Sequence, residues 1–136
     1  MKFFEFAQFL QKIENTPKRL EMTYLMTELI KKLDSDEIEK AVYLLTGRLA
    51  PLFVPLEFNF SKKLILRSLS LRLDFLNPFS GEKNIVEKLY LEKGDCGLVA
   101  EELIKENISA DLTIRDVFSK LEEIANCTGK GSVEQK

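Results

Sequence analysis

The sequence predicts an all-α fold: a compact domain of about six to seven helices joined by short loops, with residues 1–136 forming a single domain. Apolar residues recur at intervals of three and four along most of the chain, which is the spacing of one helical face. Helix-capping residues, glycines and prolines stand between these stripes. With 45% apolar and 31% charged residues, the composition is that of an ordinary globular protein.

The N-terminal part of the chain predicts three helices. Their apolar stripes are Phe3, Phe6, Ala7, Leu10 and Ile13; then Met22, Leu25, Met26, Leu29 and Leu33; then Ile38, Val42, Leu45 and Leu49. Phe4 falls off the first stripe, so we expect it to be exposed. Thr16 is expected to cap the second helix, with Pro17 at its first position, and Ser35 to cap the third. Gly47 and Pro51 end this segment.

The middle of the chain is harder to interpret. Residues 51–60 are apolar but contain Pro55, so they predict an irregular connector packed against the body of the domain. Residues 62–76 fit two patterns, because Leu69 to Phe75 alternate as a strand would while Ile65, Leu69, Leu73 and Leu76 form a helical stripe. A strand would need a partner, and the only other alternation is at 56–60. We therefore prefer a helix for 62–76.

Three further helices follow a turn at Asn77–Gly81. Ile85, Val86, Leu89 and Tyr90 predict a helix that stops at Gly94, and Asp95 caps the next one, with Cys96, Val99, Ala100 and Leu103 inward. Thr113 caps the last helix and Gly129 is expected to terminate it. The wide apolar face of this helix consists of Ile114, Val117, Phe118, Leu121, Ile124 and Ala125.

Composition and motifs exclude several classes of function. The net charge is −2, so no global basic field indicates nucleic acid, although local patches matter more than the sum. No stretch has the uninterrupted apolar length of a signal peptide or a membrane span, and two cysteines make no disulfide framework, so we expect a cytoplasmic protein with reduced thiols. The absence of histidine, of a phosphate-binding P-loop and of a dinucleotide fingerprint argues against an enzyme active site within the chain.

The C-terminal residues carry the most informative motif. Ser132 followed three residues later by Gln135 forms a capping box, which predicts the start of another helix at Ser132, although the sequence given stops at Lys136, one residue after Gln135. We therefore expect a truncated domain. Gly129, Gly131, the Ser132 hydroxyl and the new helix N-terminus could also receive a phosphate, with Lys130 and Lys136 adding positive charge. The alternative is a plain helix–turn–helix connector.

Three weaker candidates each have an ordinary structural explanation. Gly94 and Gly97 bracket a helix start, which is either a simple turn or a place where backbone N–H groups meet a phosphate. Lys18 and Arg19 stand in the first turn of a helix, where the dipole prefers acidic residues, and this hints at a function. The remaining cluster consists of Lys62, Lys63, Arg67 and Arg72, which could equally be a solvated face.

Four blocks of the sequence, in the same order, resemble the N-terminal DNA-binding domain of archaeal and bacterial ATP-dependent DNA ligases. They are Lys12–Thr16 leading to Arg19-Leu20, Val42–Pro51, Glu92–Glu101, and the stretch from Leu112 through Ala125 to Thr128–Ser132. The apolar stretch Phe53–Phe60 departs from the acidic, glycine-containing connector that is usual in the family. The likeness covers nearly the whole chain, although the family domain continues through further helices.

The resemblance implies a helical domain that binds nicked duplex DNA through its backbone and minor groove, in an enzyme of DNA replication, repair and recombination associated with the nucleoid. It implies DNA contacts at Gly129, Lys130, Gly131, Ser132 and Lys136, and also at Gly94, Gly97, Lys18 and Arg19. The parent enzyme would use ATP and Mg²⁺ in catalytic and OB-fold domains absent here. The chain itself would hold no cofactor or metal and would be inactive alone, since the adenylylation motif Lys-x-Asp-Gly does not occur in it.

Two further expectations accompany the resemblance. The surface left uncovered by missing helices would face the catalytic domains of the parent chain or cause self-association of the fragment. An alternative function is a helical protein–protein interaction or scaffold module, which the acidic net charge and the aromatic N-terminal helix favour.

Overall fold

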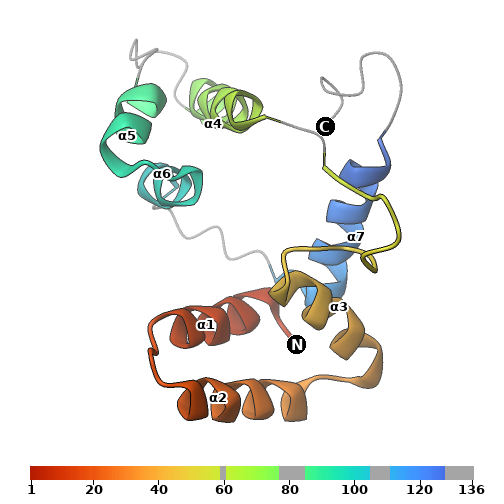
Figure 1. Ribbon diagram of the computed structural model, residues 1–136. Coiled ribbons are helices and arrows are strands. Elements are labelled where there is room, and N and C mark those ends of the chain that lie inside the picture. Colours follow the sequence, from red (N-terminus) through yellow and green to blue (C-terminus); the bar gives the residue numbers. More distant parts are fainter. Residues whose placement is uncertain (59–60, 77–84, 105–110, 128–136) are drawn as a thin grey trace. The chain divides into compact units, whose positions relative to one another are not determined.

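The computed structural model describes residues 1–58, 61–76, 85–104 and 111–127. These residues form helices and no named strand, so the predicted all-α fold class is confirmed (Figure 1). The helices are α1 (Phe3–Glu14), α2 (Arg19–Lys32), α3 (Ser35–Leu45), α4 (Lys62–Leu76), α5 (Ile85–Lys93), α6 (Cys96–Leu103) and α7 (Ile114–Asn126). None of these helices is both long and apolar enough to cross a membrane.

The chain divides into two compact units. The first comprises Met1–Phe58 and Ala110–Lys136, and therefore holds α1, α2, α3 and α7. The second comprises Asn59–Ser109 and holds α4, α5 and α6.

The core of the first unit forms where the apolar stripes of its helices meet. α1 packs against α2 and α7, and α3 packs against α7. The buried cluster consists of Phe6, Phe9, Leu29, Leu33, Ala41 and Ile114. Two backbone hydrogen bonds also join the chain start to the start of α7, from Phe3 N–H to the Leu112 carbonyl and from Ile114 N–H to the Met1 carbonyl. The N-terminal helix is thus an integral part of the core.

A second apolar cluster of this unit holds the connector after α3. Leu49, Phe118 and Ala125 are buried together, and Leu56 and Phe58 pack against them. The predicted irregular connector is confirmed for the residues described. It is only partly packed, however, because Leu52 and Phe53 are 83% and 85% exposed at its turn.

The second unit consists of three helices in mutual contact. The helical interpretation of 62–76 is confirmed, and the strand alternative is wrong. Val86 and Val99 are buried, while the expected inward residues of α4, Ile65, Leu69 and Leu73, are half-buried. An ion pair of 3.5 Å between Lys93 Nζ and Glu102 Oε2 links α5 to α6.

Two predicted helix starts are wrong. α2 begins at Arg19, not beside Thr16, because Thr16 N–H completes the end of α1 by donating to the Ile13 carbonyl. α3 is capped by Asp34 instead of Ser35, because Glu37 lies three residues after Asp34 and its Oε2 accepts from Asp34 N–H at 3.3 Å.

The buried face of α3 also differs from the predicted one. Glu37 and Ala41, one turn apart, face the core, whereas Val42, expected inward, is 44% exposed. Other expected features are confirmed: Phe4 is exposed, Gly47 follows α3 with a φ of 68°, and the Gly94 turn, the Asp95 cap and the Thr113 cap lie where predicted. The turn at Asn77–Gly81 and the expected terminator Gly129 lie outside the described residues.

Candidate nucleic-acid interface

The turn between α5 and α6 contains the bracketing pair Gly94 and Gly97. Gly94 has a φ of 72° and its N–H donates to the Tyr90 carbonyl at 2.8 Å, which closes α5. Nothing lies within 4 Å of the place where a Cβ would stand on Gly94, so backbone conformation alone explains this glycine. The left-handed conformation turns the chain directly into the cap of α6.

Asp95 and Gly97 together build the start of α6. The Asp95 carboxylate accepts the Leu98 N–H at 2.9 Å, and a Cβ on Gly97 would stand 3.0 Å from that carboxylate oxygen. Glycine at this position leaves room for the cap. The cap also occupies one of the N–H groups that a phosphate would use and places a negative charge beside the others. The turn is therefore a well-formed helix cap with reduced capacity for an anion.

Lys18 and Arg19 lie at the opening of α2. Lys18 is the N-cap residue and makes no side-chain capping bond, and both side chains are exposed. Within the described part of the chain neither has an ion-pair or hydrogen-bond partner. Two adjacent cations against the positive end of the helix dipole are unfavourable locally, offset in part by Glu21 in the same turn. They are available to an anionic ligand.

The other predicted site residues form two groups, one outside the described residues and one on α4. Gly129, Lys130, Gly131, Ser132 and Lys136, with the Ser132–Gln135 capping box, lie outside the described residues and stay predictions. The basic cluster lies on α4, and there Lys62 Nζ is 4.5 Å from the centroid of the Tyr90 ring. Lys63, Arg67 and Arg72 are exposed.

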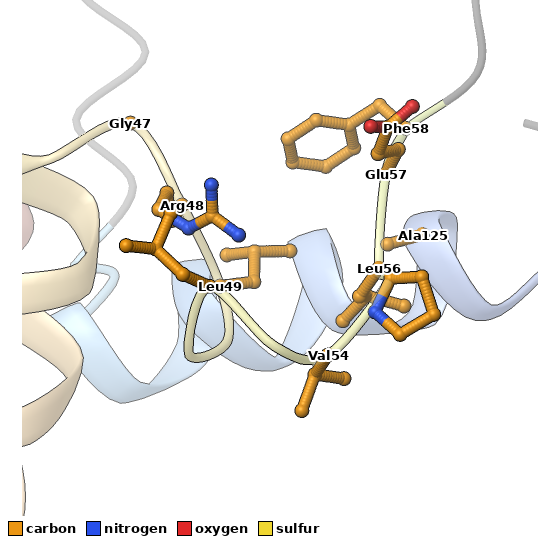
Figure 2. A pocket seen from close by; sticks show the side chains of 10 residues that line it. Gly47, Arg48, Leu49, Val54, Leu56, Glu57, Phe58 and Ala125 are labelled. Atoms are coloured by element: carbon orange, nitrogen blue, oxygen red, sulfur yellow. The ribbon is translucent and has the colours of Figure 1, made fainter.

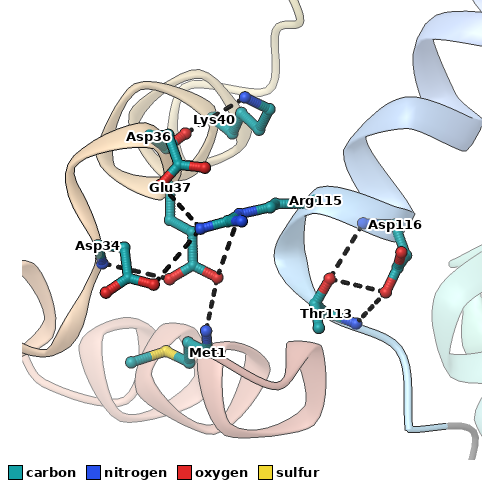
Figure 3. A network of polar contacts seen from close by, with 8 residues as sticks. All are labelled: Met1, Asp34, Asp36, Glu37, Lys40, Thr113, Arg115 and Asp116. Carbon is teal, nitrogen blue, oxygen red and sulfur yellow. Dashed lines mark hydrogen bonds and ion pairs between the residues drawn. The ribbon is translucent and has the colours of Figure 1, made fainter.

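Sequence reasoning missed a polar network around the buried carboxylate of Glu37 in the first unit (Figure 3). Glu37 is 2% exposed, and its Oε1 contacts the Met1 amino group at 2.5 Å and Arg115 Nε at 4.0 Å. Arg115 Nη2 also reaches Asp36 at 2.7 Å and Asp34 at 3.4 Å. No local signal could reveal a contact between residues this far apart in sequence, although Asp34-x-x-Glu37 could have been recognised as a capping box.

The contacts of this network change the pKa of the Glu37 carboxyl. Burial raises the pKa of its carboxyl, but hydrogen bonds from the Met1 amino group and Asp34 N–H, with the charges of Met1 and Arg115, lower it below the ordinary value. At the start of α7, hydrogen bonds from Thr113 likewise lower the pKa of Asp116. Both carboxylates are fixed as anions by structural partners. Their role is to join helices and caps.

A hollow of about 420 Å³ lies between the connector after α3 and Ala125 of α7 (Figure 2). Its charged lining side chains are Arg48 and Glu57. Arg48 Nε donates to the Ala50 carbonyl at 3.2 Å and its Nη2 to the Pro51 carbonyl at 3.4 Å, so the guanidinium holds the loop together. The Arg48 guanidinium in the lining is therefore held by backbone carbonyls.

Comparison with known proteins gives a consistent result. The model of a protein family described as "DNA ligase N terminus" matches residues 2–136. A probable DNA ligase of Dictyoglomus turgidum is 45% identical over the whole chain, one of Aquifex aeolicus is 34% identical, and DNA ligase 1 of Methanosarcina mazei is 33% identical. The chain spans 22% of the length of the first and third of these relatives and 23% of the second.

Proposed function

This chain belongs to the DNA ligase N-terminus family, and from that membership we propose that it binds nicked duplex DNA without reading base sequence, as a non-catalytic part of an ATP-dependent DNA ligase. The observation that carries the proposal is the match of the family along nearly all of the chain to relatives named DNA ligases. The parent enzyme would act in DNA replication, repair and recombination, at the nucleoid.

Among the described residues, no three carboxylate or thiol side chains stand together as metal ligands would, and Lys-x-Asp-Gly does not occur in the sequence. In this proposal, adenylylation and joining belong to other parts of the parent enzyme.

The proposed binding mechanism is contact with the DNA backbone. Phosphate contacts by lysine, arginine and backbone N–H groups fix the position of a protein on duplex DNA and carry no sequence information. In the described structure, Lys18 and Arg19 are exposed and without a protein partner, which supports a role of this kind. Approach through the minor groove would keep recognition degenerate with respect to sequence.

Salt dependence tests the mechanism. Each phosphate neutralised contributes about 0.9 to the slope of log K against log salt concentration. We expect the affinity of the 136-residue chain for nicked duplexes to fall steeply between about 50 and 200 mM salt, equally for two unrelated sequences, in a fluorescence anisotropy titration. An affinity that does not change with salt, or a strong preference for one sequence, would contradict backbone binding.

The C-terminal loop is a proposed contact that the same titration can test. Lys130→Ala with Lys136→Ala should weaken binding uniformly across sequences and lower the salt slope by about 2, one for each phosphate contact removed. Lys31→Ala with Lys120→Ala removes the same charge from exposed lysines that are paired with Glu28 and Glu123, and serves as the control. If the variant with Lys130→Ala and Lys136→Ala keeps the wild-type salt slope, these lysines do not bind phosphate.

A second candidate function is a protein–protein module. It is favoured by large apolar side chains on the surface: Leu20, Leu52, Phe53 and Leu91 are each more than four-fifths exposed. The partner would be the catalytic domains of the parent chain, or a second copy of this fragment. Retention of separately produced catalytic domains by immobilised chain, together with no DNA binding, would favour this function over the first. Sedimentation velocity measures the self-association directly.

A further inference from the structure

The cations of the described residues fall into two groups according to their partners. Most are engaged: Lys2, Lys31, Lys32, Lys93, Arg115 and Lys120 form ion pairs, Arg48 binds backbone carbonyls, and Lys12, Lys40 and Lys62 lie over aromatic rings. Within the same described ranges, the cations without such a partner are Lys18, Arg19, Lys63, Arg67, Arg72 and Lys88. Half of this second group lies on α4.

The two sides of α4 differ in character. Ile65, Leu69 and Leu73 are half-buried against α5 and α6. On the opposite side, Lys63, Arg67 and Leu71 follow one another at intervals of four residues, and all are exposed. We call Lys63 and Arg67 the α4 basic stripe. Arg72 lies half a turn around the helix from Lys63 and is not part of it.

The acidic side chains described in this unit lie on other elements than the α4 basic stripe. No acidic residue occurs between Ser61 and Leu73. The acids with described side chains, Glu87, Glu92, Asp95, Glu101 and Glu102, all lie on α5, on α6 or in the turn between them. Neither stripe residue pairs with them, so both cations remain available to an external anion.

The position of the basic residues also opposes local preference. α4 has no acidic residue in its first turn, where the helix dipole favours one, and begins instead with Lys62 and Lys63. Lys62 is stabilised by the Tyr90 ring, but Lys63 has no comparable contact within the described residues. Such a local cost is expected where residues serve a function and not the stability of the fold.

We propose that Lys63 and Arg67 form a phosphate-binding stripe that contacts the backbone of duplex DNA. The two residues are separated by a rise of about 6 Å along the helix axis, and their long side chains extend into solvent from one face. Each strand of duplex DNA presents a phosphate about every 3.4 Å along its axis, so the two cations can neutralise two phosphates of the same backbone. This inference rests on the proposed DNA-binding function and adds a site in the second unit.

The test measures the salt slope of nicked-duplex binding for the 136-residue chain. Lys63→Ala with Arg67→Ala should lower the magnitude of the slope by about 2, uniformly for unrelated duplex sequences. The charge-preserving pair Lys63→Arg with Arg67→Lys should keep the wild-type slope. Thermal unfolding by circular dichroism confirms that each variant is folded, and both sites are exposed helix positions that tolerate alanine.

A control pair separates local contact from net charge. Lys31→Ala with Lys120→Ala also removes two exposed cations, but Lys31 is paired with Glu28 at 3.1 Å and Lys120 with Glu123 at 2.6 Å. This pair should leave the slope unchanged. An equal loss in the control and in the stripe variant would overturn the proposal, as would a stripe variant with the wild-type slope.

The failure of this inference can be distinguished from the failure of the proposed function. If the wild-type chain binds DNA with a steep salt slope and the stripe variant is unaffected, only the α4 site is wrong. If the wild-type chain does not bind nicked duplex at all, the proposed function fails and the α4 site fails with it.

Discussion

Glu37 shows how one side chain can connect distant parts of a small helical unit. It is a buried carboxylate on α3 that contacts the Met1 amino group, the Arg115 side chain of α7 and the Asp34 N–H at the start of its own helix. A buried charge is tolerated only when it is paired and hydrogen-bonded. Glu37 meets this condition with partners from three segments, so it fixes the chain start against α3 and α7.

Replacing Glu37 should therefore destabilise the fold. Glu37→Gln keeps the size of the side chain but removes the buried charge that pairs with the partly buried Met1 amino group, and breaking a buried pair costs about 3 kcal/mol. We expect the free energy of unfolding in urea to fall by that amount. Asp36→Asn is the matched control, since Asp36 also binds Arg115 but is 58% exposed, and exposed pairs contribute about 0–1 kcal/mol. Equal losses in the two variants would contradict a special role for burial.

The same carboxylate predicts a pH dependence. The pKa of Glu37 is lower in the folded protein than its ordinary value of about 4.3, so the unfolded chain takes up the proton first as the pH falls. The stability that Glu37 contributes is present above the unfolded pKa and is lost as the pH falls through the folded pKa. Glu37→Gln cannot titrate there. Its free energy of unfolding should fall less than that of the wild type between about pH 6 and pH 3.

The titration of other carboxylates does not affect this comparison. A hydrogen bond from Lys2 lowers the pKa of Asp111, and hydrogen bonds from Thr113 lower the pKa of Asp116. Both carboxylates are present in the wild type and in the variant. The difference between the two pH profiles therefore reports Glu37. Parallel profiles would mean that the Met1 and Arg115 contacts do not hold this carboxylate as an anion.

At the scale of helices, capping residues explain both the successes and the errors of sequence interpretation. Thr113 and Asp95 were identified correctly because each stands just before an apolar periodic run, and each accepts an N–H of the first turn. Thr16 and Ser35 carry the same local signal. At α3 the N-cap is Asp34 and not Ser35, because the Glu37 carboxylate accepts the Asp34 backbone N–H. Glu37 is buried in the core, and a local sequence signal does not show that burial.

The cap of α7 predicts a measurable contribution. The Thr113 hydroxyl and N–H both donate to the Asp116 carboxylate, at 2.7 and 2.8 Å, and the hydroxyl oxygen accepts Asp116 N–H at 3.3 Å. Thr113→Ala removes the hydroxyl and should lower the free energy of unfolding by about 1 kcal/mol. Thr27→Ala is the control, because Thr27 is exposed within α2 and bonds only its own helix through the Thr23 carbonyl. There alanine should be neutral or slightly stabilising, since its helix propensity is higher.

At the scale of the whole molecule, periodicity was sufficient for the fold class and for the existence of every described helix. It could not reveal the division into two units, because that depends on which stripes face one another and not on where they begin. The single domain of residues 1–136 stays a prediction. The sequence shows that α4 carries several cations, but it does not show which of them have a contact partner. Lys62 and Lys63 are adjacent, and only the structure shows that Lys62 lies over the Tyr90 ring.

The whole molecule has a net charge of −2, which by itself disfavours a polyanionic ligand. Binding is decided instead by charges within a Debye length of the phosphates, about 8 Å at physiological ionic strength. A local basic stripe can function on an acidic protein for this reason.

This argument predicts a contrast between two ionic strengths. Glu14→Gln with Glu39→Gln removes two exposed carboxylates of the first unit and brings the net charge from −2 to 0. At about 150 mM salt the affinity for nicked duplex should stay within about twofold of wild type, because screening limits these charges to their own surroundings. At about 10 mM salt, where the Debye length is about 30 Å, the same variant should bind more tightly than wild type. If it bound more tightly at both salt concentrations, the total charge and not the local stripe would govern the encounter with DNA.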